Sequence, residues 1–301
     1  MFKHLLVPLD GSSLAESSVP AAAMLSRTLG ASVTLLHIIE KDAPEQVHGD
    51  RHLTNEEQAC RYLVDVVERF FPPEAEVETH VHTEEVKDVA RSIVDHTGEF
   101  SPDLIVMCVH GAGGLQDVVA GSIAQQVIGR GKTPILLTPP QVGGVIKAPA
   151  YNRLLLPMDG TGNHDQVLPL VQELAQRLPA SLNLLLVVHT LGTLPGQRAA
   201  SGWMLPNATR AILDIDEEAG RTYLEKIMVG FRQQGIKVSA AVRRGDPVQQ
   251  ILNEADSRSI DMIVLATHGK SGMDAFWAGS VAPKVVMAAR TAVLLVPVGK
   301  K

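Results

Sequence analysis

Short apolar runs alternate with amphipathic stretches along the chain, and the alternation is clearest in the second half. Five runs there predict strands, at residues 153–156, 182–188, 237–243, 262–266 and 293–296. They are apolar throughout rather than at every second position, as expected of strands covered on both faces. Helical periodicity between them predicts helices from near residue 163 and over residues 217–235, 246–258 and 279–289.

The order of these elements predicts the fold class. Strands that alternate with helices form parallel βαβ units, and five such strands make an open, doubly wound sheet. Local signals support the boundaries: Asp246 is placed to cap a helix whose first residue is Pro247, and Gly235 ends the helix before it. We therefore expect an α/β domain with helices on both faces of a five-stranded parallel sheet.

The chain contains this pattern twice. LLVPLDGS at 5–12 returns as LLLPMDGT at 154–161, and DLIVMCVHGAGG at 103–114 returns as DMIVLATHGKSG at 261–272. The offset grows from 149 to 158 residues, so the second copy gains nine residues, near GTLPGQRAASGWMLPN at 192–207. A Pro- and Gly-rich seam at 139–152 separates the copies. We expect two domains, at residues 1–140 and 151–301, and a loop at the insertion whose Trp203, Met204 and Leu205 cover a pocket or meet a partner.

Composition narrows the class of protein. The 301 residues are 45% hydrophobic and 20% charged, which is typical of a globular protein with real cores. A net charge of −6 and only 4% aromatic residues disfavour nucleic acid as a partner. Two isolated cysteines, no secretory leader pattern and no long apolar run lead us to expect a soluble cytoplasmic protein.

The candidate chemistry lies in the loops that follow the strands. Ligands of doubly wound sheets bind outside the carboxyl ends of the strands. In the second copy, Asp159 ends the first strand and can accept from ribose hydroxyls or hold a divalent cation, while backbone groups near Val187 can meet an adenine edge. The glycine-rich stretch after the fourth strand offers close backbone approach, the charge of Lys270, and Gly279-Ser280 at a helix start that favours an anion. Together these features describe a nucleotide site.

The first-strand Asp followed by G-x-x-G-x9-G-[ST] resembles the pattern of the universal stress protein family, and the resemblance covers nearly the whole chain twice. It implies two tandem flavodoxin-like domains with strand order 3-2-1-4-5. One branch of the family binds ATP, and members commonly dimerise through the fifth strand. The fifth strands TPILLTPP and TAVLLVPV are then expected to pair within the chain as a pseudo-dimer, and a homodimer of the two-domain chain is also expected.

The resemblance assigns nucleotide-binding positions in both copies. In the second copy they are Pro157, Asp159, Val187, Ala266, His268, Gly269, Lys270, Gly272, Gly279, Ser280 and Val281. In the first copy they are Pro8, Asp10, Ile38, Cys108, Gly111, Gly114, Gly121 and Ser122.

The two copies depart from the motif to different degrees. Its first glycine is Ala266 in the second copy and the bulkier Cys108 in the first, and the first copy has no counterpart of Lys270. The second copy is therefore closer to the ATP-binding pattern, and we expect ATP, with or without Mg²⁺, to occupy it more readily than the first.

Each feature also has a simpler, structural interpretation. The loop glycines can serve only a tight turn, Ser122 and Ser280 are good helix caps, and Asp10 and Asp159 can cap the first helix. His110 and His268 are expected to play a structural role within the loop.

The remaining histidines and the two cysteines allow further interpretations. His48 with His52, and His80 with His82, have spacings that suit a metal, but the sequence shows no third ligand. Cys60 is expected to be a packed thiol, and Cys108 to be the more reactive one, since a nearby helix terminus lowers a thiol pKa.

The predicted function is nucleotide binding with little or no turnover. No clear general base, nucleophile or arginine for phosphoryl transfer is evident, so any hydrolysis is expected to be slow. Two alternatives stay open: a slow Mg²⁺-dependent ATPase that uses Asp159, Lys270 and Ser280, and a scaffold that binds no nucleotide and acts through protein contacts.

Overall fold

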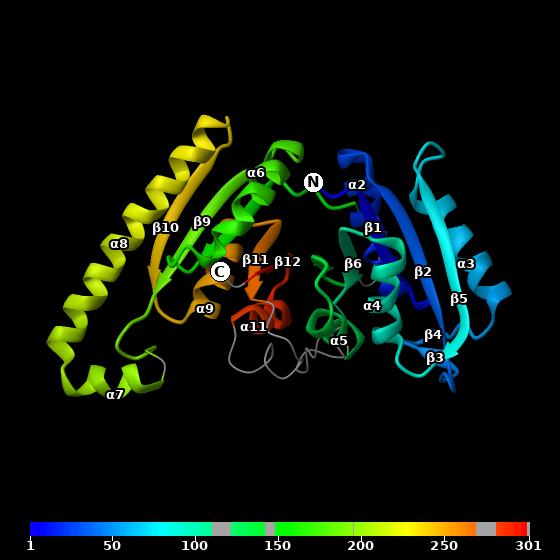
Figure 1. The fold of residues 1–301 in the computed structure, drawn as a ribbon, viewed down its shortest axis with the longest axis horizontal. Helices are drawn as coiled ribbons and strands as arrows, with labels where there is room; N and C mark the ends of the chain where they lie inside the picture. The colour runs from blue at the N-terminus through cyan, green and yellow to red at the C-terminus, as the bar shows by residue number, and fades with distance from the viewer. Residues whose placement is uncertain (110–121, 142–147, 195, 269–280, 300–301) are drawn as a thin grey trace. The chain divides into compact units, whose positions relative to one another are not determined.

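The computed structural model describes residues 1–109, 122–141, 148–194, 196–268 and 281–299. The first repeat contains β1 (His4–Pro8), α1 (Ser13–Glu16), α2 (Val19–Leu29), β2 (Ser32–Glu40), β3 (Gln46–Val47), β4 (Asp50–Arg51), α3 (Glu56–Phe70), β5 (Val77–Val86), α4 (Val89–Phe100), β6 (Leu104–Cys108), α5 (Ser122–Arg130) and β7 (Ile135–Thr138). The second contains β8 (Arg153–Met158), the short 3₁₀ helix η1 (Asn163–Val167), α6 (Leu168–Arg177), β9 (Ser181–Val188), α7 (Gly196–Met204), α8 (Pro206–Gln233), β10 (Val238–Arg244), α9 (Pro247–Ser257), β11 (Met262–His268), α11 (Val281–Ala288) and β12 (Ala292–Val298). Figure 1 labels most of these elements along the ribbon.

The first compact unit contains residues 1–150 and also Ala292–Pro297 of β12. Its long strands lie in the order β5-β2-β1-β6-β7, and neighbouring strands within this run are parallel. Counted along the chain without the small β3–β4 ribbon, this is the order 3-2-1-4-5. β12 then pairs antiparallel with β7, with Val293 opposite Leu137, so the fifth strands of the two repeats pair as the sequence suggests.

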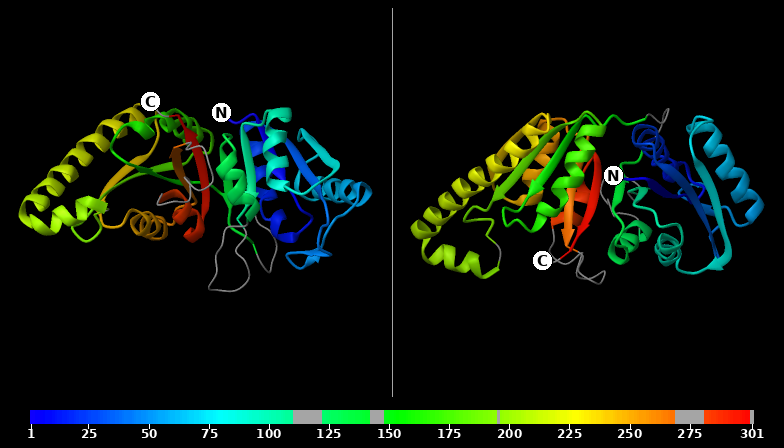
Figure 2. Two further views of the ribbon diagram at one scale, coloured as in Figure 1. Left: turned by 60° about the horizontal axis from the view of Figure 1, so that its bottom comes forward. Right: turned by 45° about the horizontal axis from the view of Figure 1, so that its top comes forward.

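The second compact unit contains residues 151–267 and 281–291. Its strands lie in the order β10-β9-β8-β11, and neighbouring strands within this run are parallel. The long helix α8 runs along β10, as both views of Figure 2 show. The second repeat therefore follows the same winding as the first over its first four long strands.

Burial explains why the strands are apolar without alternation. Leu5 and Leu6 are consecutive in β1, so their side chains point to opposite faces, and both are 0% exposed. Leu154 and Leu155 in β8 repeat the arrangement. In the first unit, α2 contacts α3 while α4 contacts α5, which is the pairing expected of helix layers on opposite faces of the sheet.

The helices follow their predicted signals except at the insertion. Asp246 caps α9 by accepting from the Gln249 N–H, and Pro247 is its first residue, as predicted. The expected loop at 192–207 is wrong: α7 and the start of α8 occupy most of it, and α8 begins at Pro206. Across the described residues, no helix is both long and apolar enough to cross a membrane.

Candidate functional site

The loop after β1 forms a tight turn built around Asp10. Its Oδ1 accepts from the Ser12 N–H (2.9 Å) and from the Ser12 hydroxyl (2.6 Å). Ser12 in turn caps α1, since its Oγ accepts from the Ala15 N–H at 3.1 Å. Gly11 between them takes φ +88°, which suits glycine. Asp10 therefore orients the helix cap rather than being the cap, and its second carboxylate oxygen makes none of these turn contacts.

His37 of β2 ties this loop to the following segment. The side chain is 0% exposed, and its Nδ1 lies 2.8 Å from the Leu9 carbonyl oxygen while Nε2 lies 3.4 Å from that of Leu53. Burial, the largest cause, lowers its pKa, although the two carbonyls and Asp10 act in the opposite direction. A neutral His37 thus buttresses the turn that presents Asp10.

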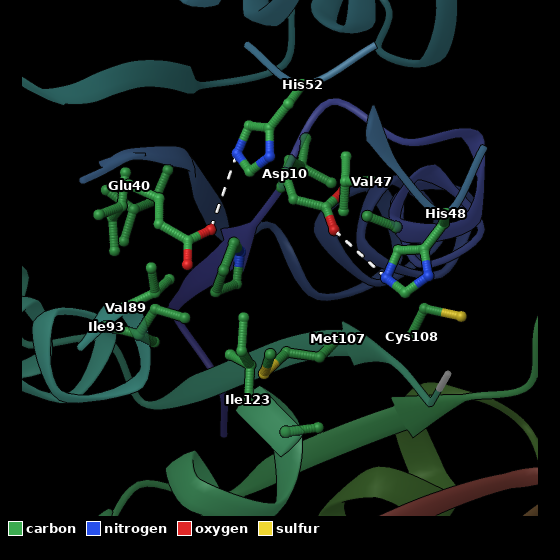
Figure 3. Close-up of a pocket in the computed structure, with 16 residues that line it drawn as sticks. Asp10, Glu40, Val47, His48, His52, Val89, Ile93, Met107, Cys108 and Ile123 are labelled. Carbon is green, nitrogen blue, oxygen red and sulfur yellow. Dashed lines mark ion pairs between the residues drawn. The ribbon is translucent and has the colours of Figure 1, made fainter. Parts of the chain in front are cut away.

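The β3–β4 ribbon brings two histidines to the same place. His48 and Gly49 form its turn with φ values of +52° and +88°, so residues 48 to 52 are not helical. His48 Nε2 lies 3.8 Å from Asp10 Oδ2, whereas His52 Nε2 lies 3.9 Å from Glu40 Oε2. Figure 3 shows the two imidazoles facing different carboxylates, so the hypothesis that His48 and His52 form one metal pair is wrong.

These elements line a cavity of about 160 Å³ at the carboxyl ends of β1, β2 and β6. Four predicted residues of the first copy, Pro8, Asp10, Ile38 and Cys108, all line it. Sequence reasoning did not assign several others to it: Leu9, Ala15, Leu36, Glu40, Val47, His48, His52, Val89, Ile93, Met107, Ile123 and Ala124. Of the polar ones, His48 and His52 lie in the turn and at the end of the β3–β4 ribbon, and Glu40 ends β2. None of the three has a counterpart in the motif, so only their proximity in the fold identifies them.

The start of α5 lies at one end of the cavity and supplies backbone N–H groups there. Ile123 and Ala124, in the first turn of this nine-residue helix, line the wall. N–H groups of a first helical turn have no partner within the helix and favour an anion. The opposite side carries the Asp10 carboxylate, and much of the remaining wall is aliphatic. The cavity can therefore hold a flat apolar group beside a hydroxyl-bearing group, with an anion toward α5.

Two expectations about the cysteines are wrong. Cys108 is buried, and burial, with a smaller contribution from Asp10, raises its pKa to about 12. The expectation that a helix terminus makes it reactive is wrong because desolvation of the thiolate dominates. Cys60 is exposed on α3, so the expectation of a packed thiol is wrong as well.

The second repeat builds the same turn after β8. Asp159 Oδ1 accepts from the Thr161 N–H (3.0 Å), and its Oδ2 accepts from the Thr161 hydroxyl (2.7 Å). Gly160 takes φ +73°, and His164 Nδ1 lies 3.5 Å from Asp159 Oδ2. Both repeats thus place an Asp between a hydroxyl residue two positions later and an imidazole.

The residue that packs against the Asp turn differs between the two repeats. β8–β9 registry makes Leu186 the counterpart of His37, and a methyl group added at Gly160 would lie 3.0 Å from it. Leu186 thus supplies packing where His37 supplies an imidazole that lies between two backbone carbonyl oxygens.

The other predicted positions of the two copies fall into two groups. Pro157, Val187, Ala266 and Val281 are described: the first three lie at or near the carboxyl ends of β8, β9 and β11, and Val281 begins α11. His268 ends β11, and Ser122 begins α5. The remaining ones lie outside the described residues: Gly111, Gly114, Gly121, Gly269, Lys270, Gly272, Gly279 and Ser280, together with His110.

The fold and the turns define a tandem pair of doubly wound α/β domains. In each domain, the loops at the carboxyl ends of the strands lie where ligands of such sheets bind. The universal stress protein family model matches the chain twice, at residues 1–139 and 150–297. The chain belongs to the universal stress protein family.

Individual relatives agree with this assignment. A universal stress protein of Mycolicibacterium smegmatis is 26% identical over 97% of this chain and 96% of its own. The crystal structure of a universal stress protein from Archaeoglobus fulgidus is 16% identical, with a TM-score of 0.66 over 98% of this chain and 96% of that one. At these identities the likeness to solved structures concerns the fold alone.

Proposed function

We propose that this chain is a regulatory protein that binds an adenine nucleotide, ATP with or without Mg²⁺, with little or no turnover. The observation that carries the proposal is the cavity of the first repeat, where a carboxylate, an aliphatic wall and the first turn of a helix converge. Membership of the family supports the same class of ligand.

Each part of a nucleotide has a chemical counterpart there. Aliphatic side chains such as Ile38, Val89 and Met107 can cover the faces of a base. The Asp10 carboxylate can accept hydrogen bonds from ribose hydroxyls. Its Oδ1 accepts from Ser12 within the turn, so Oδ2, on the side of His48, is the oxygen proposed to meet the ribose. The start of α5 suits a phosphate. The volume of about 160 Å³ suits a base and sugar better than a whole triphosphate, so the phosphates extend beyond it.

The second repeat is proposed as a second site. It keeps the Asp turn at Asp159, and its glycine-rich loop with Lys270 is closer to the ATP-binding pattern. We propose that this site binds more tightly than the first, that two such chains form a homodimer in the cytoplasm, and that the domain boundaries fall near 140 and 151.

The test uses the full-length chain, stripped of small molecules, in calorimetric titrations with ATP and Mg²⁺. Asp10→Asn keeps an acceptor oxygen for the Ser12 turn but removes the negative charge. Loss of a charge-assisted hydrogen bond, about 1.5–3 kcal/mol, is expected to weaken the first site about ten- to hundredfold. Asp159→Asn is the matched variant for the second site. Both variants should unfold at nearly the parent urea concentration.

Different outcomes separate the proposal from its alternatives. Absence of binding in the stripped parent chain, with no nucleotide in the purified protein, would sink it. Turnover above about 1 s⁻¹, abolished by Asp159→Asn, would instead establish an ATPase.

One observation favours the scaffold alternative. Trp203, Met204 and Leu205 are 77%, 81% and 65% exposed at the α7–α8 junction, which is unusual for large apolar side chains. If this alternative is right, the parent chain shows no nucleotide binding in the titrations, and Trp203→Ser removes its protein contacts.

A further inference from the structure

Three imidazoles meet on the first repeat, away from the residues that line the nucleotide cavity. His80 and His82 lie two residues apart on β5, so they share one face of the strand, and His96 comes from α4. One ligand nitrogen from each lies within 4.8 Å of the other two. The spacing along the sequence relates only His80 and His82. His96 is identified as a third ligand only from the structure, in which α4 packs beside β5.

The three rings are packed edge to face rather than dispersed. The centroid of His96 lies 5.3 Å from that of His80 and 5.0 Å from that of His82. Phe100 closes one side, with its ring centroid 4.9 Å from that of His80. Tetrahedral zinc, with Zn–N bonds of about 2.0–2.1 Å, needs about 3.3 Å between ligand nitrogens. Small side-chain rotations therefore convert this cluster into a metal site.

His96 is already in the form that a metal requires. Its side chain is buried, and its Nδ1 lies 2.7 Å from the Ser92 carbonyl oxygen, which can only accept. The proton of a neutral His96 therefore sits on Nδ1, and Nε2 presents its lone pair to the cluster. A backbone carbonyl that fixes the tautomer in this way is the usual outer partner of a metal-bound histidine.

A carboxylate stands beside the same nitrogen. Glu99 Oε2 lies 3.8 Å from His96 Nε2, one helical turn along α4. His82, His96 and Glu99 also line one shallow hollow, through which an ion can reach the imidazoles from solvent. Glu99 is placed to serve as a fourth ligand or to offset the charge of a bound cation.

The second repeat shows what the fold places there when no metal is held. His80 and His82 lie opposite Leu36 and Ile38 of β2. Ala241 and Arg243 of β10 lie opposite Leu185 and Val187, which are the equivalent positions of β9. Ala241 and Arg243 are therefore the counterparts of His80 and His82. The repeat offset makes Glu254 of α9 the counterpart of His96. Arg243 Nε donates to Glu254 Oε2 at 3.0 Å, so an ion pair occupies the position of two imidazoles.

We propose that His80, His82 and His96 form a binding site for a divalent transition-metal ion of the zinc type. Three imidazoles select zinc, copper, nickel or cobalt over magnesium and calcium, which prefer oxygen ligands. The site is separate from nucleotide binding, and it bridges the edge strand β5 to α4. A metal bound there clamps the helix to the strand.

The experiment titrates metal-free, full-length chain with Zn²⁺ in competition with a chromophoric chelator. The parent chain should bind one Zn²⁺ tightly at this site. His80→Ala should weaken that binding at least about a hundredfold, because even outer partners of a metal ligand contribute about 10–100-fold. Co²⁺ should give visible absorption bands in the parent chain that the variant lacks.

A second variant guards against loss of folding. His82→Arg with His96→Glu recreates the Arg243–Glu254 pair of the second repeat, so it should keep the parent circular dichroism while losing tight Zn²⁺ binding. His189→Gln removes a histidine of the other unit and should leave Zn²⁺ affinity unchanged. If the double variant folds and binds Zn²⁺ as tightly as the parent chain, or if the parent chain binds none, the three rings are only a packed cluster and the proposal is wrong.

Discussion

Gly11 lies where two separate constraints act on one position. Its φ of +88° is a conformation that side chains rarely adopt, and a Cβ added there would lie 2.8 Å from Cγ and Cδ1 of Leu53. Leu53 follows the β3–β4 ribbon, so a Cβ added at Gly11 would push that segment away from the Asp10 turn. We predict that Gly11→Ala strongly destabilises the first unit.

Gly30 separates the two contributions. It ends α2 with φ +67°, and a Cβ added there meets nothing within 4 Å. Alanine in the left-handed conformation costs about 1–2 kcal/mol in both variants. Overpacking adds about 1–3 kcal/mol at Gly11 only. We therefore expect Gly11→Ala to lower the free energy of unfolding by about 2 kcal/mol more than Gly30→Ala does.

Urea unfolding followed by far-ultraviolet circular dichroism measures this difference, and thermal melts should separate the variants by about 4–8 °C. A double variant tests the cause: Leu53→Ala should itself cost stability but make the added alanine at Gly11 much less harmful. If Gly11→Ala and Gly30→Ala are equally stable, the contact with Leu53 is not a constraint and the reasoning fails.

Two further predictions concern the thiols and a buried imidazole. Because Cys108 is buried with a raised pKa, iodoacetamide at pH 8 should label only Cys60 in the native chain and both thiols after denaturation; native Cys60→Ser should stay unlabelled, and fast labelling would contradict the burial. The folded pKa of His37 is lowered from 6.5, so the unfolded chain takes up its proton first and the free energy of unfolding should fall as pH drops below about 6.5. His37→Leu, the residue type at Leu186, should flatten that slope by up to about 1.4 kcal/mol per pH unit in urea titrations, and an unchanged slope would exclude His37 as its source.

The sequence predicted the elements whose signals are local. The continuous apolar runs and the Asp246 cap each depend on a few neighbouring residues, and the structure has the predicted strands and the predicted helix start at those places. The prediction of a loop at the insertion was wrong because it also relied on local signals. Its glycines and prolines suggest a loop, although α7 and α8 form across most of it. A proline is tolerated in the first turn of a helix, so Pro206 starts α8 rather than preventing it.

The sequence predicted the site residues that lie at the carboxyl ends of the strands. Asp10 follows β1 and Cys108 ends β6, and the fold class implies that these ends meet at one edge of the sheet. His52 and Glu40 meet through a two-stranded ribbon, and His96 joins His80 only after α4 packs on the sheet. Such contacts join residues of different elements, and spacing along the chain does not encode them.

The pairing of β12 with β7 has a consequence for how the protein is made. Val293 lies opposite Leu137, although more than half of the chain separates them. During synthesis, the edge of β7 therefore stays unpaired after the first repeat is complete until β12 has left the ribosome. An unpaired strand edge is a template for wrong partners, and contacts so distant in sequence form slowly. The period between completing the first repeat and completing β12 is thus when a nascent chain is most exposed to misassembly.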